Sequence, residues 1–169
     1  WVKSLYNSNG AFLSEIDDYT TGSNVYVVNA DPETTEVSQI FRSNPDGTFT
    51  TIATGGGSTS TSFDLETETD GVTVIRVTDR VTDAVTNVVT DIDTYSVYDS
   101  QGGLVASNLS DYSYETNYSD NSQIFAAEKT DPDGKVSVEL IKFLPNGLVD
   151  TAYGTAGKLL VPTGSESIE

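Results

Sequence analysis

Short runs of β-branched and aromatic residues, separated by polar turns, dominate the hydrophobic pattern of this chain. Val, Ile, Tyr and Phe gather in these runs, and Gly, Asn, Asp or Pro bounds each of them. No window repeats apolar residues at the i, i+3, i+4 and i+7 positions that an amphipathic helix requires. The pattern therefore predicts an all-β fold, with its clearest strands at 24–29, 72–77, 122–127 and 136–143.

One segment, 77–91, leaves a helix open as an alternative. It repeats a tetrad close to Val-Thr-Asp, and a period of four residues is near the helical repeat. As a strand, the same segment places apolar and acidic residues on one face. Because Val and Thr stabilise strands, we predict a long β-hairpin in which 72–78 returns as 87–98, with the turn near 82–84.

Glycine-containing turns follow an aromatic-bearing strand at four places along the chain. The residue pairs Asn-Gly and Asp-Gly tolerate the positive φ angles that tight two-residue hairpin turns need. We therefore predict antiparallel hairpins whose turns are fixed by glycine. The glycines concerned are Gly10, Gly47, Gly102 and Gly147.

These turns belong to a pattern that resembles an internal repeat. The tetrapeptide Ser-Gln-Ile-Phe occurs at 38–41 and again at 122–125, and Asp-Pro occurs at 31–32 and at 131–132. A unit of strand, turn, strand, glycine turn and strand has about the size of one β-propeller blade. The predicted fold is thus a set of antiparallel hairpin repeats forming propeller-like blades, and a β-sandwich is the alternative.

The length of the chain, 169 residues, favours a single domain at 1–169 or a fragment of a larger repeat protein. The Gly-, Ser- and Thr-rich stretch 55–62 is a candidate flexible connector. The chain opens on Trp1 rather than Met, which we interpret as the start of a mature or excised piece.

The charge balance excludes several classes of partner. Asp and Glu number 26 against 8 Lys and Arg, so the net charge is -18, and the basic residues are scattered. A polyanion would be repelled and would find no basic stripe, so we predict no nucleic-acid partner. No apolar run approaches the length of a membrane span, so we also predict no membrane insertion.

The absence of three residue types narrows the chemistry further. The chain has no Cys, Met or His, which excludes disulfides, thiolate metal sites and the commonest general base. Neighbouring carboxylates such as Asp17 and Asp18 could run glycoside hydrolysis, but with this many acids such pairs arise by chance. We therefore predict no enzyme activity, no catalytic residue and no resident cofactor.

Calcium is the one metal that the sequence makes a candidate. Two acidic turns, at 44–47 and 131–134, offer oxygen ligands, and Ca²⁺ takes six to eight such oxygens. Both turns lack the spacing of a helix–loop–helix calcium site, and Asp-Gly is also the default turn pair. The candidate metal ligands are Asn44, Asp46, Asp131 and Asp133.

A Tyr-rich polar segment, 111–120, is a candidate glycan platform. A tyrosine ring can stack on a sugar while its hydroxyl stays in water. The alternative is that these rings pack as half-buried strand residues. The candidate glycan-binding residues are Tyr112, Tyr114 and Tyr118.

The segment 143–158 resembles the delta-sixty repeat of bacterial surface proteins, whose pattern runs from an aromatic residue through Pro, Asp or Asn, and Gly to a closing Gly-Lys. The resemblance covers about residues 122–160, and Val149 and Tyr153 depart mildly from the pattern. The residues that fit are Pro145, Asn146, Gly147, Asp150, Thr151, Gly154, Gly157 and Lys158.

This resemblance implies a propeller-like blade in a large extracellular bacterial protein, with a structural motif rather than a catalytic one. Gly147, Gly154 and Gly157 are expected to serve turns, and Tyr153 is expected to pack between blades. We therefore expect a non-enzymatic structural or adhesive module of a secreted or cell-surface protein. Its expected partners are other surface-protein domains or copies of itself. The alternatives are a calcium- or glycan-binding module and a filament or surface-lattice subunit.

Overall fold

The computed structural model describes residues 3–6, 12–16, 24–28, 38–55, 61–69, 71–116 and 119–161. Within these ranges every regular element is a β-strand, and all strand pairs are antiparallel. None of the described residues forms a helix long and apolar enough to cross a membrane. The all-β antiparallel prediction is confirmed.

The described strands form one small hairpin and three larger sheets, and neighbours in sequence are neighbours in each sheet. The hairpin is β1 (Lys3–Tyr6) and β2 (Phe12–Ile16). Sheet 1 is β3 (Val25–Val28), β4 (Gln39–Ser43) and β5 (Phe49–Thr54). Sheet 2 is β6 (Thr61–Thr69), β7 (Val72–Thr82), β8 (Val89–Tyr98) and β9 (Leu104–Leu109). Sheet 3 is β10 (Asp111–Thr116), β11 (Gln123–Thr130), β12 (Val136–Phe143) and β13 (Lys158–Val161).

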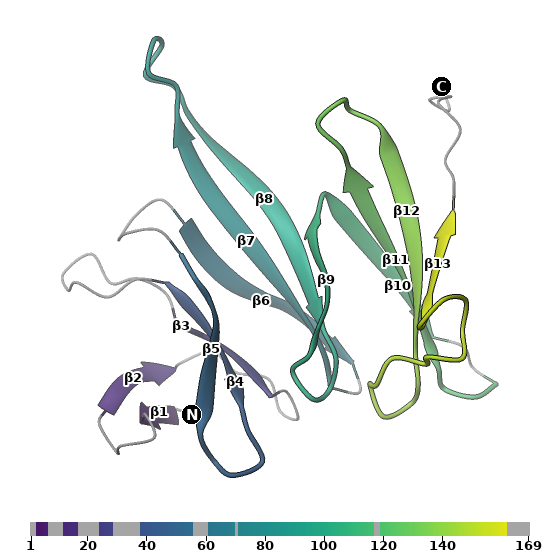
Figure 1. Cartoon of the computed structure of the whole chain (residues 1–169). Coiled ribbons are helices and arrows are strands. Elements are labelled where there is room, and N and C mark those ends of the chain that lie inside the picture. Colours follow the sequence, from purple (N-terminus) through teal and green to yellow (C-terminus); the bar gives the residue numbers. More distant parts are fainter. Residues whose placement is uncertain are drawn as a thin grey trace.

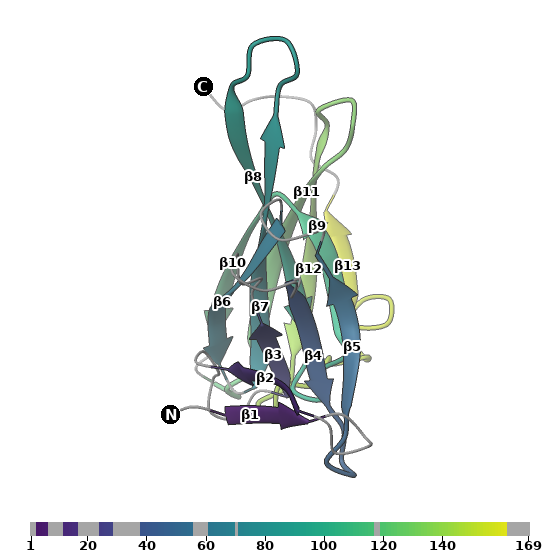
Figure 2. The ribbon, with the colours of Figure 1, turned by 90° about the vertical axis from the view of Figure 1, so that its left-hand side faces the viewer.

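The three sheets stand in a row in chain order, with their faces toward one another (Figure 1). Seen from the end of the row, their long strands run in a similar direction (Figure 2). Sheets 1 and 3 occupy opposite ends, and the described strands do not close into a ring. Sheet 2 packs an apolar core on both of its faces, so the described sheets stack as successive layers and form no propeller arrangement.

Strand alternation produces the two cores on sheet 2. Val74 and Val97 face sheet 3, whereas their neighbours Ile75 and Tyr98 face sheet 1. A strand buried on both faces needs a continuous apolar run, and β7 begins with four fully buried residues. The same run of Val, Thr and Ile was the strongest strand signal in the sequence.

Aromatic packing is densest between sheets 2 and 3. Phe125 is 1% exposed, and its ring lies 5.4 Å from those of Tyr114 and Phe143 and 5.9 Å from that of Tyr112. Burying a Phe side chain stabilises a fold by about 1.5–3 kcal/mol, and aromatic pairs add to this. This cluster is the main anchor of sheet 3.

The long hairpin predicted at 72–98 is confirmed as β7 and β8, and the helix alternative is wrong. Its turn lies at 83–88, slightly later than predicted, where the Asp83 carboxylate accepts hydrogen bonds from the amides of Val85 and Thr86. These bonds lower the pKa of Asp83. The outer half of the hairpin projects beyond the sheets (Figure 1), so its mixed apolar and acidic face is exposed.

The glycine turns at 44–47, 99–102 and 144–147 are confirmed, and their glycines have positive φ. Their form differs from the prediction. In each turn the first amide bonds to the carbonyl four residues later, and the glycine amide bonds back to the first carbonyl. Only the glycine needs a positive φ, so these are longer loops rather than primed two-residue turns.

The repeat prediction holds for the turns but not for the tetrapeptide. Gly47 follows β4, Gly102 follows β8 and Gly147 follows β12, which are equivalent strands. The Ser-Gln-Ile-Phe echo is wrong as a repeat marker, since 39–41 begins β4 whereas 123–125 begins β11, one strand earlier in its sheet.

Two other predictions fall partly outside the described residues. Gly10 and the Asp-Pro turn at 31–32 lie there, as do residues 56–60 of the candidate connector. The connector's last residues, 61 and 62, already belong to β6, where they pair with Asp79 and Thr78.

Candidate functional site

The glycine turns of the three sheets meet at one end of the molecule, at the bottom of Figure 1. Asn24 donates a side-chain hydrogen bond to the Ser100 carbonyl at 2.5 Å, which joins sheet 1 to the turn of sheet 2. The Ser100 amide donates to the Gly147 carbonyl at 3.0 Å, which joins that turn to sheet 3. A polar ladder therefore ties the row of sheets together beyond the apolar cores.

Arg42 reinforces this ladder through its aliphatic stem. A Cβ atom placed on Gly102 would lie 2.5 Å from Arg42 Cγ and 2.7 Å from Cδ, so the stem rests directly on the glycine. Gly102 also has a φ of 76°, which L side chains rarely adopt. Glycine is therefore required at this position for two separate reasons.

The segment 144–157, which carries most of the delta-sixty-like motif, closes on itself through backbone hydrogen bonds. The Asp150 amide donates to the Lys142 carbonyl, and the Gly157 amide donates to the Tyr153 carbonyl, each at 2.8 Å. A Cβ on Gly154 would clash with the backbone of Lys158, and one on Gly157 with Val149. The turn roles expected of Gly147, Gly154 and Gly157 are confirmed by their positive φ angles.

Val149, rather than Tyr153, packs against the core between sheets 2 and 3. Tyr153 is half-buried and lies outside that core. Val149 is bridged to Phe143 at the end of β12, which turns its side chain inward.

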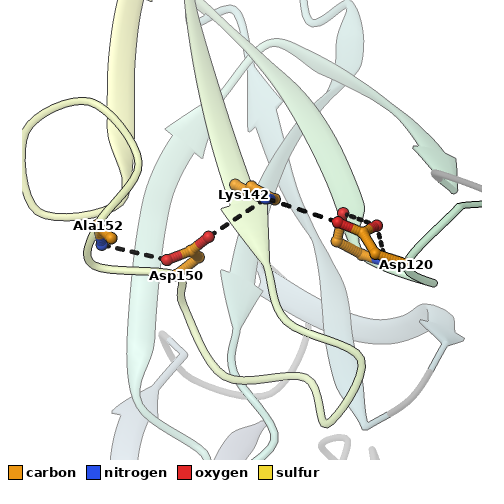
Figure 3. Close-up of polar contacts among 5 residues, drawn as sticks. Asp120, Lys142, Asp150 and Ala152 are labelled. Atoms are coloured by element: carbon orange, nitrogen blue, oxygen red, sulfur yellow. Dashed lines mark hydrogen bonds and ion pairs between the residues drawn. The ribbon is translucent and has the colours of Figure 1, made fainter.

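Lys142 is the centre of a polar cluster beside this segment (Figure 3). Its ammonium lies 3.3 Å from Asp150 Oδ2 and 4.0 Å from Asp120 Oδ2. Each carboxylate is also held locally, because Asp150 accepts from the Ala152 amide and Asp120 accepts from the Ser122 amide and hydroxyl. The hydrogen bonds from Ser122 lower the pKa of Asp120. The ion pair between Lys142 and Asp150 connects the segment to β12.

A second lysine lies in an open cleft of about 370 Å³ between β9 and sheet 3. Lys158 donates to the Val105 carbonyl at 2.6 Å and to Glu139 Oε2 at 3.2 Å. Its ammonium is therefore used for a contact between sheets, and the closing lysine of the motif has a structural role here.

The candidate calcium ligands lie on two turns at opposite ends of the row (Figure 1). The Asp131 carboxylate accepts from the amides of Asp133 and Lys135, and that of Asp46 accepts from Thr48. The Thr48 bonds lower the pKa of Asp46. Over the described ranges, no group of three or more acidic side chains is placed to hold a metal ion. The structure thus brings Asn44 and Asp46 together in one turn, apart from Asp131 and Asp133.

The candidate glycan residues lie on a strand rather than in a loop. Tyr112 and Tyr114 belong to β10, and Tyr118 lies outside the described residues. Tyr112 packs between Tyr95 and Phe125, so the alternative of a half-buried strand residue is correct for it. Tyr114 is 44% exposed but stacks on Phe125.

Comparisons with known proteins add no further constraint. No protein-family model matches the chain, and neither a curated protein nor a solved structure matches it.

Sequence reasoning missed two positions that the structure makes prominent. Arg42 and Lys158 were noted only as scattered basic residues or as a motif fit, yet each contacts a neighbouring sheet. Arg42 lies five residues before a turn glycine, as Val97 and Lys142 do. Aligning the chain on its turn glycines would have singled out this position.

Proposed function

We propose that this chain is a non-enzymatic structural module of a secreted or cell-surface bacterial protein, built from propeller-like blades stacked in a row. The observation that carries the proposal is that successive sheets bury equivalent faces against one another. Val25 and Val27 of sheet 1 face sheet 2, and Val74 and Val97 of sheet 2 face sheet 3. Stacked repeats of this kind are typical of extended scaffolds.

The shared turn geometry supports the same proposal. Each sheet ends one strand in a glycine loop. The loop of sheet 2 accepts a hydrogen bond from Asn24, next to β3 of sheet 1, and donates one to Gly147 in the loop of sheet 3. An interface that repeats its apolar core and adds polar contacts at the loops specifies the spacing of the sheets. A rigid spacer on a cell surface requires this property more than it requires a reactive site.

The chemistry of the described carboxylates also favours a structural role. Those of Asp46, Asp99 and Asp131 accept hydrogen bonds from the backbone of their own turns. Others are paired with Arg or Lys, as Asp91 is with Arg80. Carboxylates engaged in this way order loops and keep the surface charged and soluble.

Surface labelling of intact source cells tests the proposal. An antibody raised against the chain should bind intact cells, or should detect the protein in the medium, without permeabilisation. A signal that appears only after permeabilisation would overturn the assignment to the cell surface. Detection of a cytoplasmic protein in the same blot controls for leaking cells.

A second candidate function, a subunit of a filament or surface lattice, is favoured by the outer face of sheet 3. Phe125 and Ile141 face sheet 2, so the alternate residues of β11, β12 and β13 face outward. That outer face carries six apolar residues that are only partly buried, beside the charged Glu128 and Lys142, whereas the equivalent faces of sheets 1 and 2 pack against the next sheet. Its apolar residues are Ile124, Ala126, Val138, Leu140, Leu159 and Val161.

Sedimentation velocity over a range of protein concentrations tests this second candidate. If a second copy packs on this face, the wild type should associate and Leu159→Asp should shift it to monomer. Leu159 is 45% exposed, so the substitution should leave the fold intact. Val85→Asp, at an 89% exposed site on the hairpin tip, is the matched control. A wild type that stays monomeric at millimolar concentration would exclude self-association through this face.

A further inference from the structure

An open cleft of about 450 Å³ lies between the glycine turns of sheets 1 and 2. Its volume is within the range of small-molecule sites. Residues from both sheets contribute to it, so it exists only because the two turns are held side by side. Its lining residues are Asn24, Arg42, Ser43, Asn44, Pro45 and Gln101.

Arg42 differs from the other two arginines of the chain. Arg76 pairs with Asp64 at 2.9 Å and with Glu66 at 3.2 Å, and Arg80 pairs with Asp91 at 2.9 Å. Across the part of the chain that the structure describes, no hydrogen bond or ion pair involves the Arg42 guanidinium. In a chain with 26 acidic residues, an unpaired guanidinium on this half-buried residue is able to bind an anion.

The cleft is rigid on the side of Asn24 and Asn44. Asn24 donates to the Ser100 carbonyl and accepts from Ser43 Oγ at 3.1 Å. The Asn44 side-chain amide donates to Thr48 Oγ1 and Thr50 Oγ1. These bonds fix the walls, and the Arg42 stem is fixed on Gly102, so the cleft is preorganised.

The groups left to meet a ligand have a defined chemistry. The Gln101 side chain is exposed and makes no hydrogen bond with a described residue, so its amide can both donate and accept. Pro45 adds an apolar ring surface. The two nearest turn carboxylates are engaged, since Asp46 accepts from Thr48 and Asp99 accepts from the amides of Gln101 and Gly103.

We propose that this cleft binds a carboxylate-bearing sugar, namely a single uronate residue. The planar guanidinium matches a carboxylate with two parallel hydrogen bonds, and the Gln101 amide matches a sugar hydroxyl. Pro45 offers the apolar surface that the C–H face of a sugar needs. The net charge of -18 favours a single carboxylate over a doubly charged phosphate, because repulsion rises with ligand charge.

Amide chemical-shift titration of the whole chain with three probes tests the proposal. The probes are glucuronate, glucose and acetate, each added up to about 50 mM in a buffer near physiological ionic strength, where charge repulsion is screened beyond about 8 Å. Glucuronate should bind in the millimolar range with shifts at residues 42–47 and 99–103. It should bind at least tenfold more tightly than either glucose or acetate.

Three substitutions, one of them a control, give the test its specificity. Arg42→Met keeps the stem that packs on Gly102 and should weaken glucuronate binding at least tenfold. Arg80→Met, at the exposed pair on the hairpin, is the matched control and should bind glucuronate as the wild type does. Gln101→Ala should weaken glucuronate binding and leave acetate binding unchanged. Thermal melting of each variant shows whether its fold is intact.

Several results would overturn the proposal. Absence of glucuronate-induced shifts at the highest concentration would exclude the site. If acetate bound as tightly as glucuronate, the cleft would recognise the carboxylate alone and not the sugar. If glucose bound as tightly as glucuronate, the carboxylate and its contact with Arg42 would contribute nothing to binding. Unchanged binding in a folded Arg42→Met variant would place any sugar site elsewhere.

Discussion

Lys158 Nζ, on β13, donates a hydrogen bond at 2.6 Å to the carbonyl oxygen of Val105, on β9. The two residues are 53 positions apart in sequence and belong to different sheets. The Val105 carbonyl lies on β9, the edge strand of sheet 2, and the ammonium that donates to it comes from sheet 3. The last strand of one sheet is thus held by the last strand of the next.

Replacing this lysine should weaken the boundary between the sheets. Lys158→Met keeps the stem but removes the bonds to Val105 and Glu139, so we expect a loss of about 1–2 kcal/mol in the free energy of unfolding. Urea unfolding of the variant and the wild type measures this loss. Lys135→Met, on an exposed turn, is the control and should change stability by less than about 0.5 kcal/mol. Equal effects would show that the contact contributes nothing.

The contact between Arg42 and Gly102 can be isolated with a second glycine. Gly47→Ala should cost about 1–2 kcal/mol, because its φ is 81° but no atom lies within 4 Å of the new Cβ. Gly102→Ala should cost more, because its Cβ also meets Arg42 Cγ. In an Arg42→Ala background the cost of Gly102→Ala should fall to that of Gly47→Ala. A cost that stays the same in both backgrounds would disprove the packing argument.

Sheet 3 should depend on Phe125. Phe125→Ala leaves a cavity among three aromatic rings and should destabilise the protein by about 3–5 kcal/mol. Val85→Ala, at the exposed hairpin tip, should have almost no effect. Hydrogen exchange on Phe125→Ala should show faster exchange in β11 and β12 than in β3 and β4. A uniform increase would instead mean that the row of sheets unfolds as one unit.

Alkaline pH should destabilise the fold through Tyr98. Burial raises the pKa of this 3% exposed side chain from 10 to about 12. Because the folded pKa lies above the unfolded one, the stabilisation is complete below pH 10 and is lost as the pH rises from 10 to about 12. The loss from this residue is at most about 3 kcal/mol.

The variant Tyr98→Phe isolates that titration from those of other tyrosines and lysines. Its free energy of unfolding should fall less steeply between pH 10 and 12 than that of the wild type. Tyr114→Phe, at a 44% exposed residue, is the control for the loss of a tyrosine hydroxyl. If Tyr98→Phe follows the wild-type curve, Tyr98 does not carry the pH dependence.

The sequence alone determined the strands, the glycine loops and the absence of helix among the described residues. These features are local, because β-branched runs such as 72–77 favour extended backbone and glycine permits positive φ wherever it occurs. The motif at 143–158 likewise predicted its own turns. Gly147, Gly154 and Gly157 adopt the positive φ angles that the turns of this same segment need.

Only the tertiary structure decided which strands share a sheet and which side chains meet between sheets. Tyr112 was indistinguishable in sequence from an exposed sugar platform, and stacking of sheet 3 on sheet 2 placed it between Tyr95 and Phe125. Arg42 and Gln101 likewise line one cleft only because two turns are held side by side. Such contacts join residues that are far apart in the chain. Local backbone preferences do not determine which of these distant residues come into contact.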